Sequence, residues 1–106
     1  MAPTCTHLDQ VMLEELPEAV EGCEDCLRSG DKWLHLRICL ACGHVGCCDD
    51  SPNRHATAHA NTSDHPIIRS LEPGEDWCWC YRDELAYLLP ELRGDTRIPP
   101  SPLLYG

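Results

Sequence analysis

Apolar and polar residues alternate along residues 33–38, and this period of two predicts a half-buried β-strand that leads into Cys39. One face of the strand carries Leu34, Leu36 and Ile38, and the other carries Trp33, His35 and Arg37. We also expect a turn and a returning strand over residues 43–47, and another strand over residues 65–71. These segments together predict a short twisted sheet.

Two helices are predicted beside this sheet. An alanine-rich run over residues 54–60 follows a turn-forming cluster, and it places His55 and His59 on one helical face because they are four residues apart. A second helix is predicted to begin near Asp83 and to bury one stripe of leucines, namely Leu85, Leu88, Leu89 and Leu92. The expected fold class is therefore a small α+β domain.

The chain has 106 residues, which is the length of one domain. We place this domain at residues 1–92, because the three prolines in residues 93–102 prevent a regular element there. Residues 93–106 are predicted to form a Pro-rich tail, mobile or extended. No run approaches the roughly 20 apolar residues that a bilayer span needs, and no secretory signal is evident. We therefore expect a cytoplasmic protein.

Charge narrows the range of partners. Eighteen acidic residues against eight basic ones give a formal net charge of −10. Binding to phosphate backbones depends on neutralisation by Lys and Arg, so nucleic acid is not expected as a partner. Anionic membrane surfaces are excluded for the same reason.

The spacing of the cysteines favours metal binding over disulfides. Cys23 and Cys26, like Cys39 and Cys42, are separated by two residues, a spacing that lets two thiolates bind one tetrahedral ion. Nine cysteines cannot all pair, and disulfides rarely persist in a reducing compartment. A structural zinc site supplies about 10–16 kcal/mol of apparent folding energy, so we expect little stable structure without metal.

The order of these residues resembles the UBP-type zinc finger, the ubiquitin-binding zinc finger of deubiquitinases and a histone deacetylase. The matching motifs run from Cys5 to Leu92: C-x-H, C-x2-C, C-x2-C-G-x3-C, H-x3-H-x5-H, and Trp-Cys near the end. The resemblance implies a cross-braced α+β module with three zinc ions, here expected as a stand-alone member of the family.

The resemblance also implies three ligand sets. The first comprises Cys23, Cys26, Cys47 and His55, and the second comprises Cys39, Cys42, His59 and His65. The third joins Cys5 and His7 to a final pair, for which we favour Cys80 and Asp83. Two alternatives stay open: Cys78 with Cys80 as the final pair, and Cys48 in place of Cys47.

A turn that carries metal-binding cysteines is called a knuckle. In the family, an arginine shortly after the cysteine of the third knuckle holds the carboxylate of ubiquitin's C-terminal Gly-Gly, and aromatic side chains line the binding site of the tail. Trp79 and Tyr81 match these aromatic positions, and we expect Trp33 and Trp77 to lie near them. The arginine is missing, because its place is taken by Cys48-Asp49-Asp50. Arg37 and Arg54 are the candidate substitutes for the missing arginine.

We therefore predict a non-catalytic protein-interaction module whose partner is a protein or peptide, with a C-terminal tail as one option. Trp33, Trp79 and Tyr81 are the candidate peptide-binding residues. Two alternatives remain: capture of a free C-terminal Gly-Gly peptide, and an aromatic cluster that only covers the zinc core.

A zinc hydrolase is the competing class. Residues 55–59 have two histidines at helical spacing, but Ala56 stands where the H-E-x-x-H motif places its glutamate. Every predicted site is filled by four protein ligands, whereas a catalytic zinc keeps one position open. No catalytic residue is therefore assigned.

Overall fold

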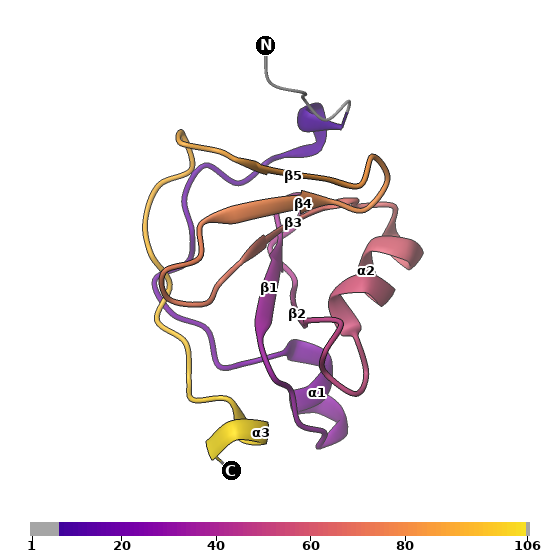
Figure 1. The fold of residues 1–106 in the computed structure, drawn as a ribbon, viewed down its shortest axis with the longest axis vertical. Helices are drawn as coiled ribbons and strands as arrows, with labels where there is room; N and C mark the ends of the chain where they lie inside the picture. Colours follow the sequence, from indigo (N-terminus) through magenta and orange to yellow (C-terminus); the bar gives the residue numbers. More distant parts are fainter. Residues whose placement is uncertain (1–6, 106) are drawn as a thin grey trace.

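The structure is a computed structural model that describes residues 7–105, and its centre is a five-stranded antiparallel sheet in the order β2-β1-β3-β4-β5 (Figure 1). The strands are β1 (Leu36–Cys39), β2 (Val45–Cys47), β3 (Ile67–Ser70), β4 (Trp77–Cys80) and β5 (Leu85–Leu88). The helical segments are η1 (Leu8–Gln10), α1 (Glu24–Ser29), α2 (His55–Ser63) and α3 (Pro102–Tyr105). The predicted α+β class is confirmed.

The first strand lies inside the sheet, between β2 and β3. Leu36 pairs with Cys47 of β2, and Ile38 pairs with Arg69 of β3. Leu36 and Ile38 are fully buried, as the alternating pattern predicts. The strand begins at Leu36, three residues later than predicted, and Trp33, which the alternation places on the face opposite Leu36, is also buried, at 7% exposure. The predicted strands at residues 43–47 and 65–71 contain β2 and β3.

The predicted alanine-rich helix is α2, and it lies against β2. Gly46 makes this close approach possible, because a Cβ atom there would lie only 2.6 Å from the backbone nitrogen of Ala56. Ala56 and Ala60 are the buried residues of α2. Small side chains on both elements thus bring the start of the helix next to Cys47.

The second predicted helix is wrong, because residues 85–88 form β5 instead. Glu84 adopts a left-handed backbone, and its N–H donates to the carbonyl of Cys80, which turns the chain back on β4. Leu85 to Leu88 then pair residue by residue with β4. Leu88, a member of the expected leucine stripe, is 59% exposed. Antiparallel pairing with β4 outweighs the helical spacing of the leucines.

Besides η1, two short helices were not predicted. In α1, the sulfur of Cys23 accepts a hydrogen bond from the N–H of Cys26, and Gly30 ends the helix with a left-handed backbone. Acidic residues in its first turn and Arg28 in its last turn are the sequence signals that indicate this helix. The other unpredicted helix, α3, is four residues long.

The C-terminal segment is extended and runs beside residues 14–20. Parallel bridges join Glu15 to Arg93 and Ala19 to Arg97. Farther along, the hydroxyl of Ser101 donates to the carbonyl of Trp33 at 2.8 Å. In Figure 1 this yellow segment follows the indigo one down one side of the sheet.

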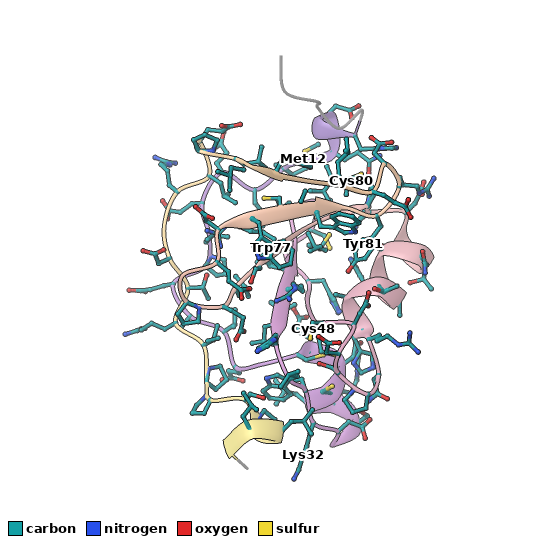
Figure 2. All side chains as sticks on the ribbon, viewed as in Figure 1. Met12, Lys32, Cys48, Trp77, Cys80 and Tyr81 are labelled. Carbon is teal, nitrogen blue, oxygen red and sulfur yellow. The ribbon has the colours of Figure 1, made fainter. Side chains whose placement is uncertain are left out.

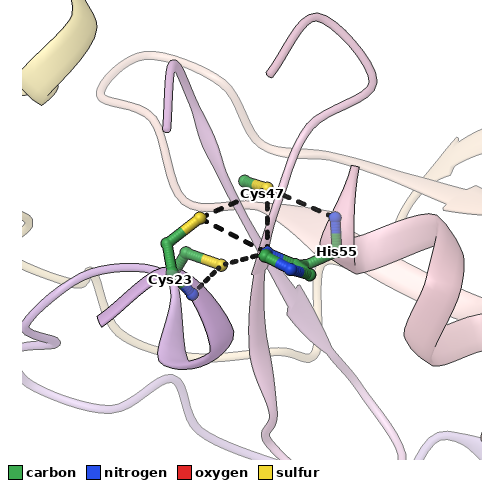
Figure 3. Close-up of side chains that lie close together, drawn as sticks. Cys23, Cys47 and His55 are labelled. Carbon is green, nitrogen blue, oxygen red and sulfur yellow. Dashed lines mark hydrogen bonds between the residues drawn. The ribbon is translucent and has the colours of Figure 1, made fainter. Parts of the chain in front are cut away.

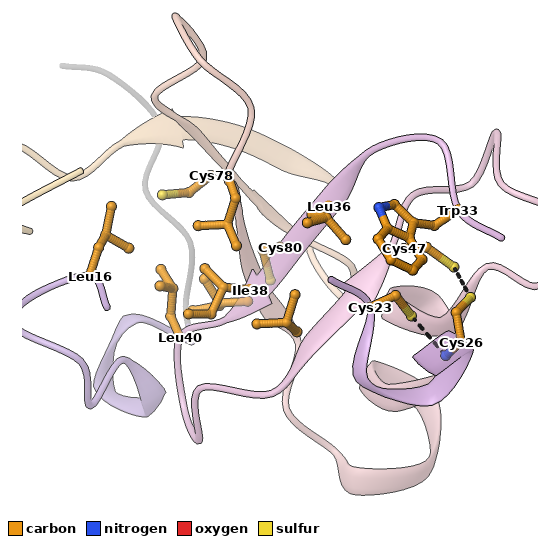
Figure 4. Close-up of a cluster of buried hydrophobic side chains, with 13 residues drawn as sticks. Leu16, Cys23, Cys26, Trp33, Leu36, Ile38, Leu40, Cys47, Cys78 and Cys80 are labelled. Carbon is orange, nitrogen blue, oxygen red and sulfur yellow. Dashed lines mark hydrogen bonds between the residues drawn. The ribbon is translucent and has the colours of Figure 1, made fainter. Parts of the chain in front are cut away.

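The core is small and rich in sulfur. Trp33 lies beside the cysteines at one end of the buried cluster, and Leu16 lies at the other end with Cys78 (Figure 4). Leu36, Ile38 and Leu40 fill the space between them. Cysteines are the other large group in this cluster, so much of the core is made of potential metal ligands. No helix within residues 7–105 is long and apolar enough to cross a membrane.

Candidate metal centres and the aromatic groove

The first predicted ligand set comes together as one compact cluster. The Nδ1 atom of His55 lies 3.3 Å from the sulfurs of Cys23 and Cys26, and 3.5 Å from that of Cys47. The sulfurs of Cys26 and Cys47 are 4.0 Å apart. Figure 3 shows these side chains pointing toward one another from α1, β2 and the start of α2. Cys48, the alternative to Cys47, lies beside Ser51 and outside the cluster.

These separations fit a tetrahedral zinc ion. Zn–S bonds of about 2.3 Å and Zn–N bonds of about 2.0 Å place neighbouring ligand atoms about 3.5–3.8 Å apart. The donor set of three sulfurs and one imidazole is typical of structural zinc. Backbone N–H groups also point at two sulfurs, from Cys26 to Cys23 at 3.4 Å and from His55 to Cys47 at 3.2 Å. Such donors stabilise thiolates, the form that binds metal.

The second predicted set also forms a cluster, made of Cys39, Cys42, His59 and His65. The sulfur of Cys42 lies 3.3 Å from Nε2 of His59. The Nδ1 atom of His65 is buried and has no hydrogen-bond partner among the described residues. A buried nitrogen without a partner is costly unless it binds something, and a metal ion satisfies it.

The two clusters are interleaved along the chain. Helix α2 contributes His55 to the first cluster and His59, one turn later, to the second. The β1–β2 hairpin contributes Cys39 and Cys42 to the second cluster and Cys47 to the first. This is the predicted cross-braced arrangement.

A third cluster contains His7, Cys80 and Asp83. Nδ1 of His7 lies 3.2 Å from the Asp83 carboxylate and 3.6 Å from the sulfur of Cys80. The N–H of Asp83 donates to the sulfur of Cys80, as in the first knuckle. The predicted ligand Cys5 lies outside the described residues. The structure therefore brings Cys80 and Asp83 to His7, while Cys78 is packed in the core and belongs to no cluster of the described chain.

Burial governs the protonation of the thiols. It raises the pKa of Cys23, Cys26 and Cys39. The thiol of Cys47 adds to this effect at Cys23 and Cys26, and the thiol of Cys42 adds to it at Cys39. Burial, with the nearby His44 and His65, lowers the pKa of His59 and so favours the neutral imidazole that a metal requires. Without metal these groups are neutral, and a bound cation would displace the thiol protons.

The candidate peptide-binding residues separate into two places. Trp79 and Tyr81 line a hollow of about 260 Å³ on the sheet face opposite the core, here called the aromatic groove. Its lining comprises Arg37, Cys48, Asp49, Asp50, Ile68, Trp77, Trp79 and Tyr81. Trp33 is not among these residues, and it packs instead beside the first cluster (Figure 4). Arg54 is exposed at the start of α2 and is also outside the groove.

The alternation of β4 explains the groove. Cys78 and Cys80 face the core, so Trp77 and Trp79 face the other side, and Tyr81 continues that face (Figure 2). Trp77 was not among the predicted binding residues, although Trp77, Trp79 and Tyr81 are spaced two residues apart, which indicates one face of a strand. Ile68 was also missed, because it is a buried residue of an apolar strand.

Arg37 provides the positive charge of the groove. Its guanidinium carbon lies 4.7 Å from the centre of the Trp77 ring, an arrangement typical of a cation–π contact. Its Nη1 donates to the carbonyl of Leu36 and to the hydroxyl of Ser70. The side chain is only 12% exposed, so these contacts fix its position. On the opposite side, Asp49 accepts a hydrogen bond from Thr57 at 2.5 Å.

Together, the sheet and its Cys/His clusters define a small zinc-finger protein. The sequence profile described as "Zn-finger in ubiquitin-hydrolases and other protein" matches residues 23–90, more than half of the chain. The chain belongs to this family, so the resemblance found in the sequence is confirmed.

The similar proteins include ubiquitin hydrolases much longer than this chain and a solved structure of a protein of similar length. Ubiquitin carboxyl-terminal hydrolase 16 from Mus musculus is 33% identical over 107 residues, and the match covers 80% of this chain but 12% of the hydrolase. The Danio rerio hydrolase of the same name is 29% identical and is covered to 13%. The solution structure of protein RPA1320 from Rhodopseudomonas palustris is 45% identical, with a TM-score of 0.75. That match covers 96% of this chain and 97% of the other.

Proposed function

We propose that this protein is a non-catalytic, zinc-stabilised module that binds a segment of another protein in the aromatic groove. The observation that carries the proposal is the row of Trp77, Trp79 and Tyr81, which project from the sheet on the side away from the core. Rigid aromatic side chains in a hollow are the usual anchors of protein recognition. The formal net charge of −10 favours a basic partner surface.

Zinc has a structural role in this proposal. Three ions are expected, with Cys5 completing the third site. Four protein ligands surround each of the first two positions, which leaves no open coordination position for a substrate. The chain's own thiolates and imidazoles hold the knuckles in place, and they orient the sheet that carries the groove.

A free C-terminal peptide is the candidate ligand that one observation favours. Arg37 is fixed in the groove beside Trp77, and a guanidinium binds a carboxylate through paired hydrogen bonds. In this proposal Arg37, whose Nη1 also lies 4.0 Å from the Glu75 carboxylate, supplies the positive charge that the acidic residues 48–50 do not. The relatives are ubiquitin carboxyl-terminal hydrolases, which makes a Gly-Gly terminus the first peptide to test.

Calorimetric titration with a peptide ending in free Gly-Gly, and with its C-terminal amide, tests this candidate. A charged hydrogen bond is worth about 1.5–3 kcal/mol, so the amide is expected to bind about 10- to 100-fold more weakly. Arg37→Gln should reduce binding of the free acid to the level of the amide. Arg69→Gln, on the opposite sheet face, is the matched control and should change nothing.

The outcomes separate the ligand from the groove. Equal binding of acid and amide, lost in Trp79→Ala, would support the groove and reject the carboxylate. Binding that survives both Trp79→Ala and Arg37→Gln would place the interaction elsewhere on the protein.

A further inference from the structure

His44 stands between the first two clusters and belongs to neither of them in the described chain. It lies in the turn between β1 and β2, two residues after Cys42. Its ring stacks on that of His59, with the centroids 4.4 Å apart and the planes 10° apart. One face of the ring therefore supports a predicted ligand of the second ion.

The edge of the same ring contacts the first knuckle. Nε2 lies 2.8 Å from the carboxylate of Asp25, and Nδ1 lies 3.5 Å from that of Glu24. The other oxygen of Glu24 accepts a hydrogen bond from the N–H of Val45 at 2.7 Å. Glu24 and Asp25 are the two residues between Cys23 and Cys26. The knuckle of the first ion thus binds the turn of the second.

These contacts depend on the form of the knuckle. Cys23 and Cys26 hold Glu24 and Asp25 at the start of α1, and a knuckle that lost its ion would lose this geometry. His44 would then lose its carboxylate partners, and His59 would lose the ring that fixes its orientation. Groups that orient a ligand affect metal affinity by about 10- to 100-fold.

We propose that His44 is a positioning residue that couples the two zinc sites, so that loss of one ion lowers the affinity of the other site for its ion. The inference rests on the proposed zinc binding at both clusters. It goes beyond the linkage through α2, which joins His55 to His59 whether or not His44 is present. Such coupling is reciprocal, so each ion strengthens the binding of the other.

Chelator titration followed by native mass spectrometry tests the coupling. At each chelator concentration, alkylation of the free thiols and peptide mapping show which knuckle has opened. In the wild type, the first-site cysteines (Cys23, Cys26 and Cys47) should become reactive at the same chelator concentration as the second-site cysteines (Cys39 and Cys42). In His44→Ala the two midpoints should separate by about fivefold or more, and a species that has lost one of the two ions should accumulate.

Two further variants locate the effect. His44→Phe keeps a stacking ring but loses both carboxylate contacts, so it should also separate the midpoints, and it serves if His44→Ala does not fold. His35→Phe is the matched control, because His35 is a half-buried histidine whose ring lies beside Glu72 and belongs to neither cluster. It should keep a single midpoint.

Three results would overturn the proposal. One is separate loss of the two ions in the wild type, and another is a single shared midpoint in both His44 variants. A wild-type protein that carries no zinc would overturn the proposed metal binding as well. Zinc-loaded protein with uncoupled sites would reject only the role of His44.

Discussion

The zinc half of the molecule (residues 23–65) and the β4–β5 hairpin (residues 77–88) bring their residues together in different ways. In the zinc half, eight side chains from distant positions meet in two interleaved clusters, and its strands are only three or four residues long. The hairpin has four consecutive paired positions, and its cluster has three members in the described chain. Clusters of potential metal ligands distinguish the first region, whereas strand pairing along its whole length distinguishes the second.

This difference determines how each region should respond to mutation. A region whose shape depends on a few ligands fails abruptly when one is lost, because the remaining elements bury too little surface to fold alone. A hairpin joined along its length loses stability in smaller steps. The expected effects therefore decrease from the buried ligands of the zinc half to the exposed edge of the hairpin.

Removal of a buried ligand in the zinc half should have the largest effect. Cys26→Ser takes one sulfur from a fully buried cluster position. Structural zinc contributes on the order of 10 kcal/mol, as much as the whole stability of a typical domain, so we expect the variant to be unfolded at 25 °C. Circular dichroism and the zinc count by native mass spectrometry measure this. Cys48→Ser is the control, and loss of an ion there would contradict the assignment of Cys47.

The close approach of α2 and β2 should be the next most sensitive feature. Gly46→Ala would place a methyl group 2.6 Å from the Ala56 nitrogen, and the backbone must shift to accept it. We expect the free energy of unfolding to fall by about 3 kcal/mol, measured by urea denaturation. Gly74→Ala is the comparison: its backbone is left-handed, unlike that of Gly46, but a Cβ atom there would face open space, so only about 1 kcal/mol of backbone strain is expected. Equal costs would contradict the packing of α2 on β2.

In the hairpin, loss of a ligand should be milder. Cys80→Ala should remove the third ion yet leave the domain folded, at a cost of about 2 kcal/mol, because β3 and β5 still pair with β4. Cys78→Ala should keep every ion and cost about 1 kcal/mol, since the residue is packed in the core and lies outside the clusters of the described residues. The zinc counts of the two variants decide between Asp83 and Cys78 as partner of Cys80.

The smallest effect is expected at the edge of the hairpin. Leu88→Thr changes an exposed position of β5, so the free energy of unfolding should change by less than about 0.5 kcal/mol. In the helix that the leucine spacing predicts, the same residue would be buried. Leu36→Thr, in the core, should cost more than about 2 kcal/mol. A large cost at Leu88 would favour the helix and contradict the observed strand.

The sequence was informative where ligands determine the structure. The resemblance to UBP-type zinc fingers, carried by the order and spacing of cysteines and histidines, implied the ligand sets of the zinc half, and the structure brings the members of each set together. Zinc occupancy itself stays a prediction. The helix at α2 was also predictable, because an alanine-rich run follows a turn-forming cluster there, and the four-residue spacing then places His55 and His59 on one face.

The hairpin could not be predicted in the same way. Leucines at residues 85, 88, 89 and 92 fit a helical stripe, while pairing with β4 is a long-range interaction that local spacing does not encode. The position of Arg37 in the groove also depends on sheet order, because β3 brings Ile68 and β4 brings Trp77 to the same face. Such features follow from tertiary pairing rather than from a motif.

The extended C-terminal segment is held against one of the three indoles, that of Trp33, through Ser101, whereas the other two indoles share the aromatic groove. Trp33 is enclosed beside the sulfurs of the first cluster, whereas Trp77 and Trp79 are partly open to solvent. Fluorescence of the protein therefore contains two signals: a blue-shifted component shielded from soluble quenchers, which follows the seating of the C-terminal segment, and a quenchable component, which follows occupancy of the groove.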